Sequence, residues 1–257
     1  MLLILVGALV LIDAGVTLVW QEPISAIYAK LRQDHLSGAL VKVERAALTP
    51  HERRALASLS DEHARIAFLA RELQHGAAAG SAVGRIRIPR IGASFVVVKG
   101  TGASELKGGP GIFSGTGFPG SAETTAIAGH RTTYLAPFRH IDALRAGSRI
   151  MLEMPYAHFT YVVIGQRVVA PTDVSAALAK VGYNRLVLSA CTPLFSAAQR
   201  LLVFAHLART VPVGAARRLP SGALARPIEA PGAHPRRRAP LPAVLEPLKP
   251  PLPPAVS

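Results

Sequence analysis

Cysteine is almost absent from this chain, whose 257 residues include a single one, Cys191. One cysteine excludes an internal disulfide, and no group of His, Cys, Asp and Glu residues has the spacing of a structural zinc site. We therefore expect no metal and no other cofactor. Aromatic residues are also few, at 5% of the chain, and proteins that bind single-stranded nucleic acid normally use them for base stacking.

Acidic residues are scarce as well. The chain has 15 Asp and Glu against 29 Lys and Arg, which gives a formal net charge of +14. Nearly all of this excess lies in residues 84–257. Such a surface favours anionic partners, namely acidic lipid head groups, acidic cell-wall polymers or nucleic acid. Nucleic acid is the least favoured of the three, because the basic residues of 84–211 are scattered and are not interleaved with aromatics.

Residues 1–20 are apolar except at Asp13 and Thr17. About twenty helical residues span the hydrocarbon core of a bilayer, and Trp20 suits the aromatic belt at its interface. The stretch therefore predicts an uncleaved, single-pass membrane anchor. A cleaved signal peptide is the alternative, but the run is long for one and lacks both a basic start and a clear cleavage site.

The charges beside this run leave its orientation open. Lys30 and Arg32 follow it, whereas no Lys or Arg precedes it. Positively charged flanks normally stay in the cytoplasm, so this rule taken alone would place the rest of the chain there.

Residues 21–83 have the pattern of a helical linker. Thr49-Pro50-His51-Glu52 matches a capping box with proline at the first helical position. Apolar residues then recur at helical intervals, and Gly76 is a natural helix stop. We favour a helix packed on the domain that follows over a stalk or a lid beside a functional site.

Residues 84–211 change to the two-residue period of β-strands, beginning with the alternation of Arg85–Ile91. Glycine and proline separate many short apolar runs, which predicts a β-sandwich or a closed barrel. The expected strands are 85–91, 95–99, 124–128, 148–154, 159–169, 184–190 and 200–206, with short helices near 137–144 and 174–180.

Residues 212–257 hold more than half of the 21 prolines and a basic run at Arg236–Arg238. This composition cannot build a core and predicts a disordered or polyproline-like tail. A dispensable extension is the favoured interpretation, and a tail that binds polyanions or penetrates the cell wall is the alternative.

Three side chains in the β-rich domain could form a nucleophilic site. The thiol of Cys191 follows a buried strand, and a thiol attacks carbonyl carbon well only as a thiolate. His130 could serve as its general acid and base, and Arg200 could donate hydrogen bonds to a developing oxyanion. Taken singly, each also has an ordinary role: a small buried hydrophobe, a solvated loop histidine and a salt-bridging arginine.

The strings around these residues resemble the sortase family, most closely its class E members from high-GC Gram-positive bacteria. The strings are Ala126-Ile-Ala-Gly-His130-Arg-Thr-Thr-Tyr134-Leu-Ala-Pro-Phe and Leu188-Ser-Ala-Cys191-Thr-Pro-Leu-Phe-Ser-Ala-Ala-Gln-Arg200-Leu, with shorter matches at 87–92 and 107–111. The resemblance covers roughly residues 84–208 and keeps the order of the motifs.

This resemblance implies a mainly β fold, a closed eight-stranded barrel with short helices that follows the anchor and the helical linker. It also implies a cysteine transpeptidase held in the cell membrane with its catalytic domain outside the cytoplasm. Such enzymes cleave the Thr–Gly bond of a C-terminal sorting signal, LPxTG-like or LAxTG-like, on secreted proteins. An amine of a peptidoglycan precursor then takes over the acyl group.

Carried over by motif, Cys191 is the nucleophile, His130 the general acid and base, and Arg200 the oxyanion or substrate stabiliser. Tyr134 and Ala190 are expected to contact substrate. The family usually has threonine where this chain has Val187 and Ala190. That departure motivates an alternative, a catalytically weak sortase-fold protein that binds sorting signals or partners. A transpeptidase of the L,D type is disfavoured, since its Ser-x-Gly-Cys-Arg motif does not match.

Overall fold

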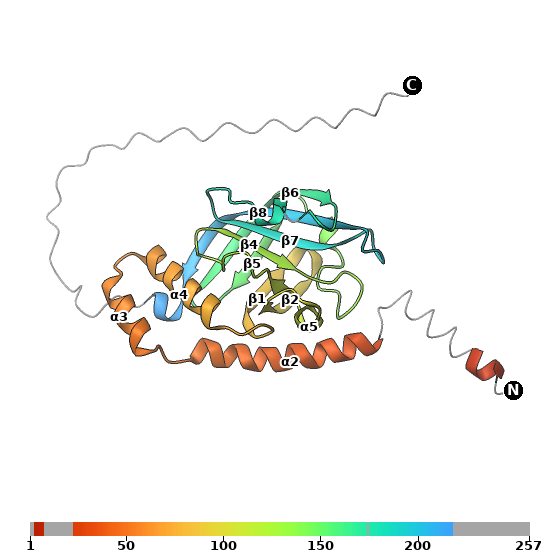
Figure 1. Ribbon diagram of the computed structural model, residues 1–257, viewed down its shortest axis with the longest axis horizontal. Helices are drawn as coiled ribbons and strands as arrows, with labels where there is room; N and C mark the ends of the chain where they lie inside the picture. Colours follow the sequence, from red (N-terminus) through yellow and green to blue (C-terminus); the bar gives the residue numbers. More distant parts are fainter. Residues whose placement is uncertain (1–2, 8–22, 174, 218–257) are drawn as a thin grey trace, which may run out of the picture. The chain divides into compact units, whose positions relative to one another are not determined.

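The computed structural model describes residues 3–7, 23–173 and 175–217. Eight strands form a closed barrel in the order β1-β2-β3-β4-β7-β8-β6-β5 (Figure 1). This confirms the predicted mainly β, eight-stranded barrel. The strands are β1 (Ala82–Ile88), β2 (Ala93–Lys99), β3 (Gly111–Ile112), β4 (Thr124–Ala128), β5 (Arg149–Glu153), β6 (Ala157–Val169), β7 (Arg185–Thr192) and β8 (Gln199–Pro212).

Helices and 3-10 turns surround the barrel. They are α2 (Pro23–Arg45), α3 (Pro50–Ser58), α4 (Glu62–Gly76), α5 (Ala103–Gly108), α6 (Ser175–Leu178), η1 (Pro89–Ile91), η2 (Ile141–Ala143) and η3 (Gly214–Ala216). Strand pairing is antiparallel except between β2 and β3 and between β4 and β7. The parallel pair β4–β7 matters most for the site, since it brings together two strand ends that point the same way.

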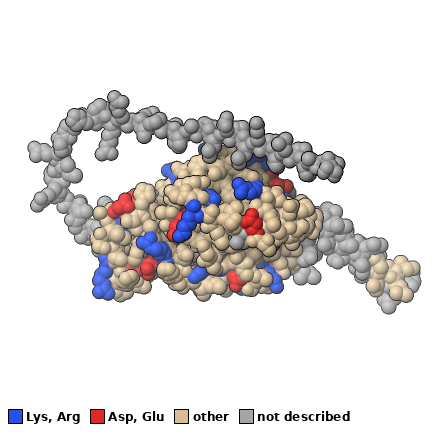
Figure 2. All heavy atoms as spheres, turned by 45° about the horizontal axis from the view of Figure 1, so that its top comes forward, with Lys and Arg blue, Asp and Glu red and all other residues tan. Residues whose placement is uncertain are grey.

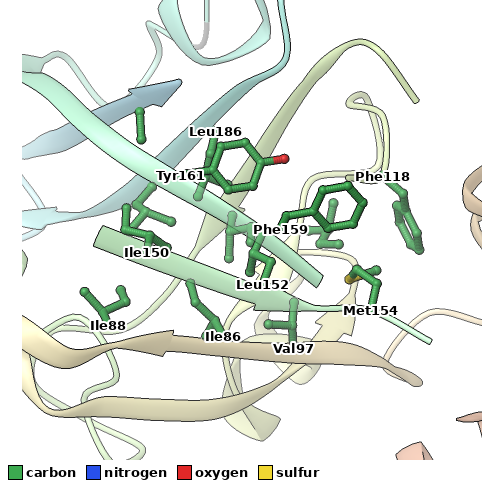
Figure 3. Packing of buried hydrophobic residues seen from close by; sticks show 14 of the residues in the cluster. Ile86, Ile88, Val97, Phe118, Ile150, Leu152, Met154, Phe159, Tyr161 and Leu186 are labelled. Carbon is green, nitrogen blue, oxygen red and sulfur yellow. The ribbon is translucent and has the colours of Figure 1, made fainter. Parts of the chain in front are cut away.

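Alternating side chains of the strands fill the barrel. In β6, Phe159 and Tyr161 are buried and their ring centroids lie 6.4 Å apart. Figure 3 shows them beside Ile86 of β1 and Ile150 and Leu152 of β5, which are also buried. Each large apolar side chain removed from water contributes on the order of 1.5–3 kcal/mol. This core, without any disulfide, is what holds the barrel closed.

The linker helices pack on the barrel. The predicted capping box is confirmed: Thr49 accepts from the backbone of Glu52, and the carboxylate of Glu52 accepts from the backbone of Thr49. The pattern that follows is divided between two helices, because Asp61 caps a second one, α4. Ile66 and Leu69 of α4 belong to the main core, as the interpretation of a packed helix requires.

The long helix α2 runs along the outer side of β1 and β2 (Figure 1). Leu36 and Leu40 pack there against Val96 and Val98 of β2. Between them and the N-terminal end of the helix, the amide of Gln33 acts like a short strand partner. It accepts from the backbone N–H of Val96 at 2.7 Å and donates to the carbonyls of Val96 and Gly108.

One predicted helix is wrong. Residues 137–144 form turns and a single 3-10 turn, η2. The backbone N–H of Phe138 donates to the carbonyl of His130, and the carbonyl of Arg139 accepts from the side chain of Arg131. These long-range partners take backbone groups that a helix would use. The helix expected at 174–180 shrinks to α6 for a similar reason, since Arg185 binds the carbonyls of Ala176 and Ala179.

Strand ends also differ from the prediction. Pro89 ends β1 because it has no N–H to continue the ladder, and η1 follows. The sequence pattern predicts no strand at 111–112, where the structure has the two-residue strand β3. Strand β7 extends to Thr192, so Cys191 lies within the strand. Its partner on β8 is Arg200.

Both ends of the chain fall largely outside the described residues. Residues 3–7 are helical, and residues 8–20 of the predicted anchor are not described. Among the helices that are described, none combines the length and the apolar character that a bilayer crossing needs. Of the predicted tail, only residues 212–217 are described, and they end β8 and form η3.

Charged side chains of both signs are mixed on one face of the barrel (Figure 2). On the face shown in Figure 2, Lys and Arg side chains are separated by acidic and uncharged residues. This agrees with the scattered pattern in the sequence and with a surface that has no single basic groove on that face.

We expect Gln33→Ala to loosen α2 from the barrel. The change leaves the buried N–H of Val96 without its partner, which costs about 1–3 kcal/mol in the free energy of unfolding. Urea unfolding followed by circular dichroism measures this. Asp34→Ala, at the exposed neighbouring position, is the matched control and should change stability by no more than about 0.5 kcal/mol. Equal values for the two variants would contradict the role given to Gln33.

Candidate active site

The parallel pairing of β4 with β7 brings His130 to Cys191. In this ladder Ala128 lies opposite Ser189, and the N–H of Gly129 donates to the carbonyl of Ser189 at 3.1 Å. His130 is two residues beyond Ala128, and Cys191 is two residues beyond Ser189. Because parallel strands advance in the same direction, the two residues follow the same edge of the barrel side by side.

Arg200 reaches the same point from the other side of β7. It is the cross-strand partner of Cys191 in the antiparallel β7–β8 ladder. Directly opposite residues place their side chains on the same face, with Cβ atoms about 4.5–5.5 Å apart. Cys191 is half-buried and unpaired. The three predicted residues therefore meet at one end of the barrel, with the cysteine strand in the middle.

The guanidinium of Arg200 is engaged locally. Its Nη1 donates to the carbonyls of Ala197 at 2.9 Å and Gln199 at 3.0 Å. Both bonds use the same nitrogen. Ala197 belongs to the segment that joins β7 to β8, and Gln199 is the first residue of β8. The side chain is thereby held beside Cys191 by its own loop.

The ring of His130 is partly removed from water. Burial lowers its pKa from the ordinary 6.5, because the charged ring is disfavoured there. Its Nε2 is buried and has no hydrogen-bond partner among the described residues. The ring of Tyr134 packs on the histidine, with centroids 5.2 Å apart. These contacts orient the imidazole and leave a nitrogen available for a thiol or a substrate.

Residues 86–208 match the sortase domain family. Over these residues the barrel is similar to the sortases. By motif, the three residues above stand at the nucleophile, histidine and arginine positions of that family.

Similar proteins include Sortase D of Bacillus subtilis (strain 168), 31% identical over 114 residues. That match covers 44% of this chain and 56% of the relative, so the chain spans little more than half the length of that protein. The SrtF sortase from Corynebacterium diphtheriae has 27% identity and a TM-score of 0.51, covering 54% of this chain and 90% of the other. A Clostridium perfringens Sortase D5 transpeptidase has 25% identity and a TM-score of 0.50, over 62% and 95%. The expected likeness to class E stays a prediction.

Tyr134 links His130 to the N-terminal helix. Its ring lies edge-on to Tyr28 of α2, with centroids 6.3 Å apart, and its backbone N–H donates to the hydroxyl of Ser25 at 3.4 Å. The ammonium of Lys107 lies 6.0 Å from the centroid of the same ring. The substrate contact of Tyr134 stays a prediction, whereas its ring contact with His130 is direct.

The loop after His130 has an unusual backbone. Tyr134, Leu135 and Ala136 have φ values of 50°, 63° and 41°, in the left-handed region that non-glycine residues rarely adopt. Each such residue costs on the order of 1–3 kcal/mol and persists only where its surroundings impose it. Gly129 shows how tightly the loop is packed, because a Cβ there would lie 2.7 Å from the ring of Phe138.

The two positions that lack the usual threonine face opposite ways. Ala190 is buried in the main core inside the barrel. Val187 packs in a separate cluster with Val169 and Ala177, on the side of β7 that alternation assigns to Cys191. Of the two replacements, Val187 is therefore the one on the cysteine face.

Exposed apolar residues follow the cysteine strand. Leu194 and Phe195 lie in the β7–β8 segment, and 64% of Phe195 is exposed. The guanidinium of Arg139 lies 5.7 Å from the centroid of the Phe195 ring. An exposed aromatic residue four positions after Cys191 is suited to bind an apolar partner.

A large cavity of the molecule lies away from this site. A cavity of about 820 Å³ opens among α2, α3, α4 and the β5–β6 turn, and Val43, Leu73 and Tyr156 are among its lining residues. His130, Cys191 and Arg200 do not line it. The register of the strands, rather than concavity, identifies the reactive end of the barrel.

The sequence did not reveal the role of Arg131. This residue stands in the quoted motif, yet nothing in its type or spacing indicates burial. The structure buries it to 4% exposure and pairs it with Asp142 at 3.0 Å.

We expect His130 to titrate with a midpoint below pH 6.5 in the Cys191→Ala variant, where no thiolate can favour the charged ring. The unfolded chain binds the proton at a higher pH than the folded chain does. His130 therefore reduces the free energy of unfolding as the pH is lowered through 6.5. NMR of the ring protons measures the midpoint, and a value at or above 6.5 would contradict the burial argument.

Proposed function

We propose that this chain is a membrane-anchored sortase that cleaves a C-terminal sorting signal at a Thr–Gly bond and joins the released protein to a peptidoglycan amine. The observation that carries the proposal is the strand register that puts Cys191 between His130 and Arg200. The signal is LPxTG-like or LAxTG-like. The partners are secreted proteins that carry it and a peptidoglycan precursor.

In the first half of the reaction, the Cys191 thiolate attacks the threonine carbonyl carbon and forms a C–S bond. The carbonyl electrons move to oxygen, and the guanidinium of Arg200 stabilises that charge. The C–N bond then breaks as His130 gives its proton to the leaving glycine amine. A thioester on Cys191 remains.

In the second half, the acceptor amine attacks the thioester. His130 takes the proton from the amine, and the C–S bond breaks to release the thiolate. One proton is thus shared between Cys191 and His130 in the resting enzyme. Burial lowers the pKa of His130, whereas a negative charge beside the ring favours its charged form.

Arg200 gains a further acceptor during this cycle. Its Nη1 binds the carbonyls of Ala197 and Gln199, and the oxyanion adds a stronger, charged acceptor. Substrate binding along Leu194 and Phe195 would move the same segment. The arginine is therefore positioned before substrate arrives, and its hydrogen bonds are completed by the transition state.

The place of the anchor supports catalysis at the membrane. Residues 1–20 precede α2, and the N-terminal part of α2 contacts Tyr134 beside the histidine. An anchor there keeps the reactive end of the barrel close to the bilayer, outside the cytoplasm. Secreted proteins and lipid-linked peptidoglycan precursors meet at that surface.

A second candidate is a sortase-fold protein that binds sorting signals with little turnover. Val187 favours it, because an apolar side chain replaces a hydroxyl on the cysteine face. The two functions predict the same binding of a signal peptide and differ in its cleavage.

We expect the chain to cleave a fluorogenic LPxTG-like or LAxTG-like peptide and to transfer it to an added amine. Cys191→Ala should abolish both reactions. Arg200→Ala should lower kcat by about 10²–10³-fold, as the loss of an oxyanion donor does elsewhere. The release of fluorescence and the mass of the products measure these changes.

Arg209→Ala serves as the control for Arg200→Ala, because Arg209 is an exposed arginine on the same strand. It should keep the wild-type rate within about twofold. Binding of both peptides without cleavage would favour the second candidate, and equal cleavage by wild type and Cys191→Ala would exclude the proposed mechanism.

A further inference from the structure

Arg131 is a buried cation next to the catalytic histidine. Only 3% of its side chain is exposed, against 58% for its ion-pair partner Asp142. Removing a guanidinium from water is costly unless its N–H groups find partners. An exposed carboxylate offsets little of that cost. The other hydrogen bonds of Arg131 therefore have to offset the rest of the desolvation cost.

All of the guanidinium nitrogens have partners, and those partners lie on different segments. Nε and Nη2 donate to the carbonyl of Arg139 at 3.2 and 3.1 Å, and Nη2 also pairs with Asp142. Nη1 donates to the carbonyl of Cys191 and to the hydroxyl of Thr192, each at 3.3 Å. These contacts match the five N–H donors that an arginine has. One planar group therefore joins the histidine loop to the nucleophile strand.

This link begins where the sheet stops. The β4–β7 ladder ends at Ala128 and Ser189, and the last backbone bond between the segments comes from Gly129. Beyond it, Arg131 connects the two segments again, directly at the residue that carries the thiol. His130 lies between these two connections.

We propose that Arg131 is a positioning residue that sets the spacing between the imidazole of His130 and the thiol of Cys191. It holds the carbonyl of Cys191 from one side and the strained histidine loop from the other. It does not touch the reacting atoms. The proposal rests on the proposed function, since it assigns Arg131 to the same thiol and imidazole.

Lysine at this position keeps the charge and loses the planar fork. Arg131→Lys should therefore lower kcat about 10–100-fold and change KM by less than about twofold, because a displacement of about 1 Å at the reacting groups costs up to 10²-fold. The rate of Cys191 alkylation by iodoacetamide at pH 7 should fall to the rate of His130→Ala. This second measurement needs no peptide substrate.

The double variant Arg131→Lys/His130→Ala is the decisive comparison. If Arg131 acts through His130, the double variant is alkylated at the rate of His130→Ala alone. If the two effects multiply, the proposal is overturned. Cleavage of no peptide by the wild type would refute the proposed function, while the alkylation rates would still decide on Arg131.

Arg65→Lys is the matched control, because Arg65 is equally buried and also donates to a backbone carbonyl, that of Ala215 on η3. It should lower the thermal midpoint without changing kcat or the alkylation rate. Equal losses of kcat in both lysine variants would assign Arg131 a purely structural role.

Should Arg131→Lys fail to fold, Asp142→Asn replaces it. That change removes the charged partner of the guanidinium and leaves the buried arginine in place. We expect a smaller fall in the alkylation rate, about two- to fivefold, and again no further fall in combination with His130→Ala. An unchanged rate, or an effect that multiplies with that of His130→Ala, would overturn the proposal.

Discussion

The parallel pairing of β4 with β7 is the constraint on which the site depends. It aligns two strand ends that are far apart in the sequence, so that His130 and Cys191 advance along the same edge. The antiparallel partner β8 then brings Arg200 opposite the cysteine. A one-residue slip in either ladder would turn these side chains to the other face. The closed barrel and its apolar core fix both registers, and this is how packing far from the thiol determines its chemistry.

The loop after His130 adds to the positioning that the sheet provides. The loop after His130 carries three left-handed residues and a buried arginine, features that are unfavourable when taken alone. They persist because backbone carbonyls, an ion pair and the ring of Phe138 hold them. Tyr134 extends the same network to α2. His130 is thus supported by the sheet, by its own loop and by the N-terminal helix.

The sequence predicted the features that depend on local pattern. Alternating residues indicated the strands, Thr49 and Glu52 indicated a helix start, and the strings around His130 and Cys191 indicated the family. The prediction failed where contacts with residues distant along the chain determine the local structure. The helix expected at 137–144 does not form, and the carbonyl of Arg139 accepts from the side chain of Arg131 instead. The two-residue strand β3 is defined by its pairing with β2 and β4. The burial of Arg131 does not follow from residue type, because its partners Arg139, Asp142 and Cys191 are brought to it only by the fold.

The central claim is that Cys191 forms a thioester with the threonine of a sorting signal. Intact-protein mass spectrometry tests it most directly, after brief mixing of the chain with an LPxTG-like or LAxTG-like peptide and acid quenching. We predict an adduct with the mass of the peptide up to its threonine, located on Cys191 and removed by hydroxylamine. The absence of this adduct from a folded protein that turns over the peptide, or its presence in Cys191→Ala, would contradict the account.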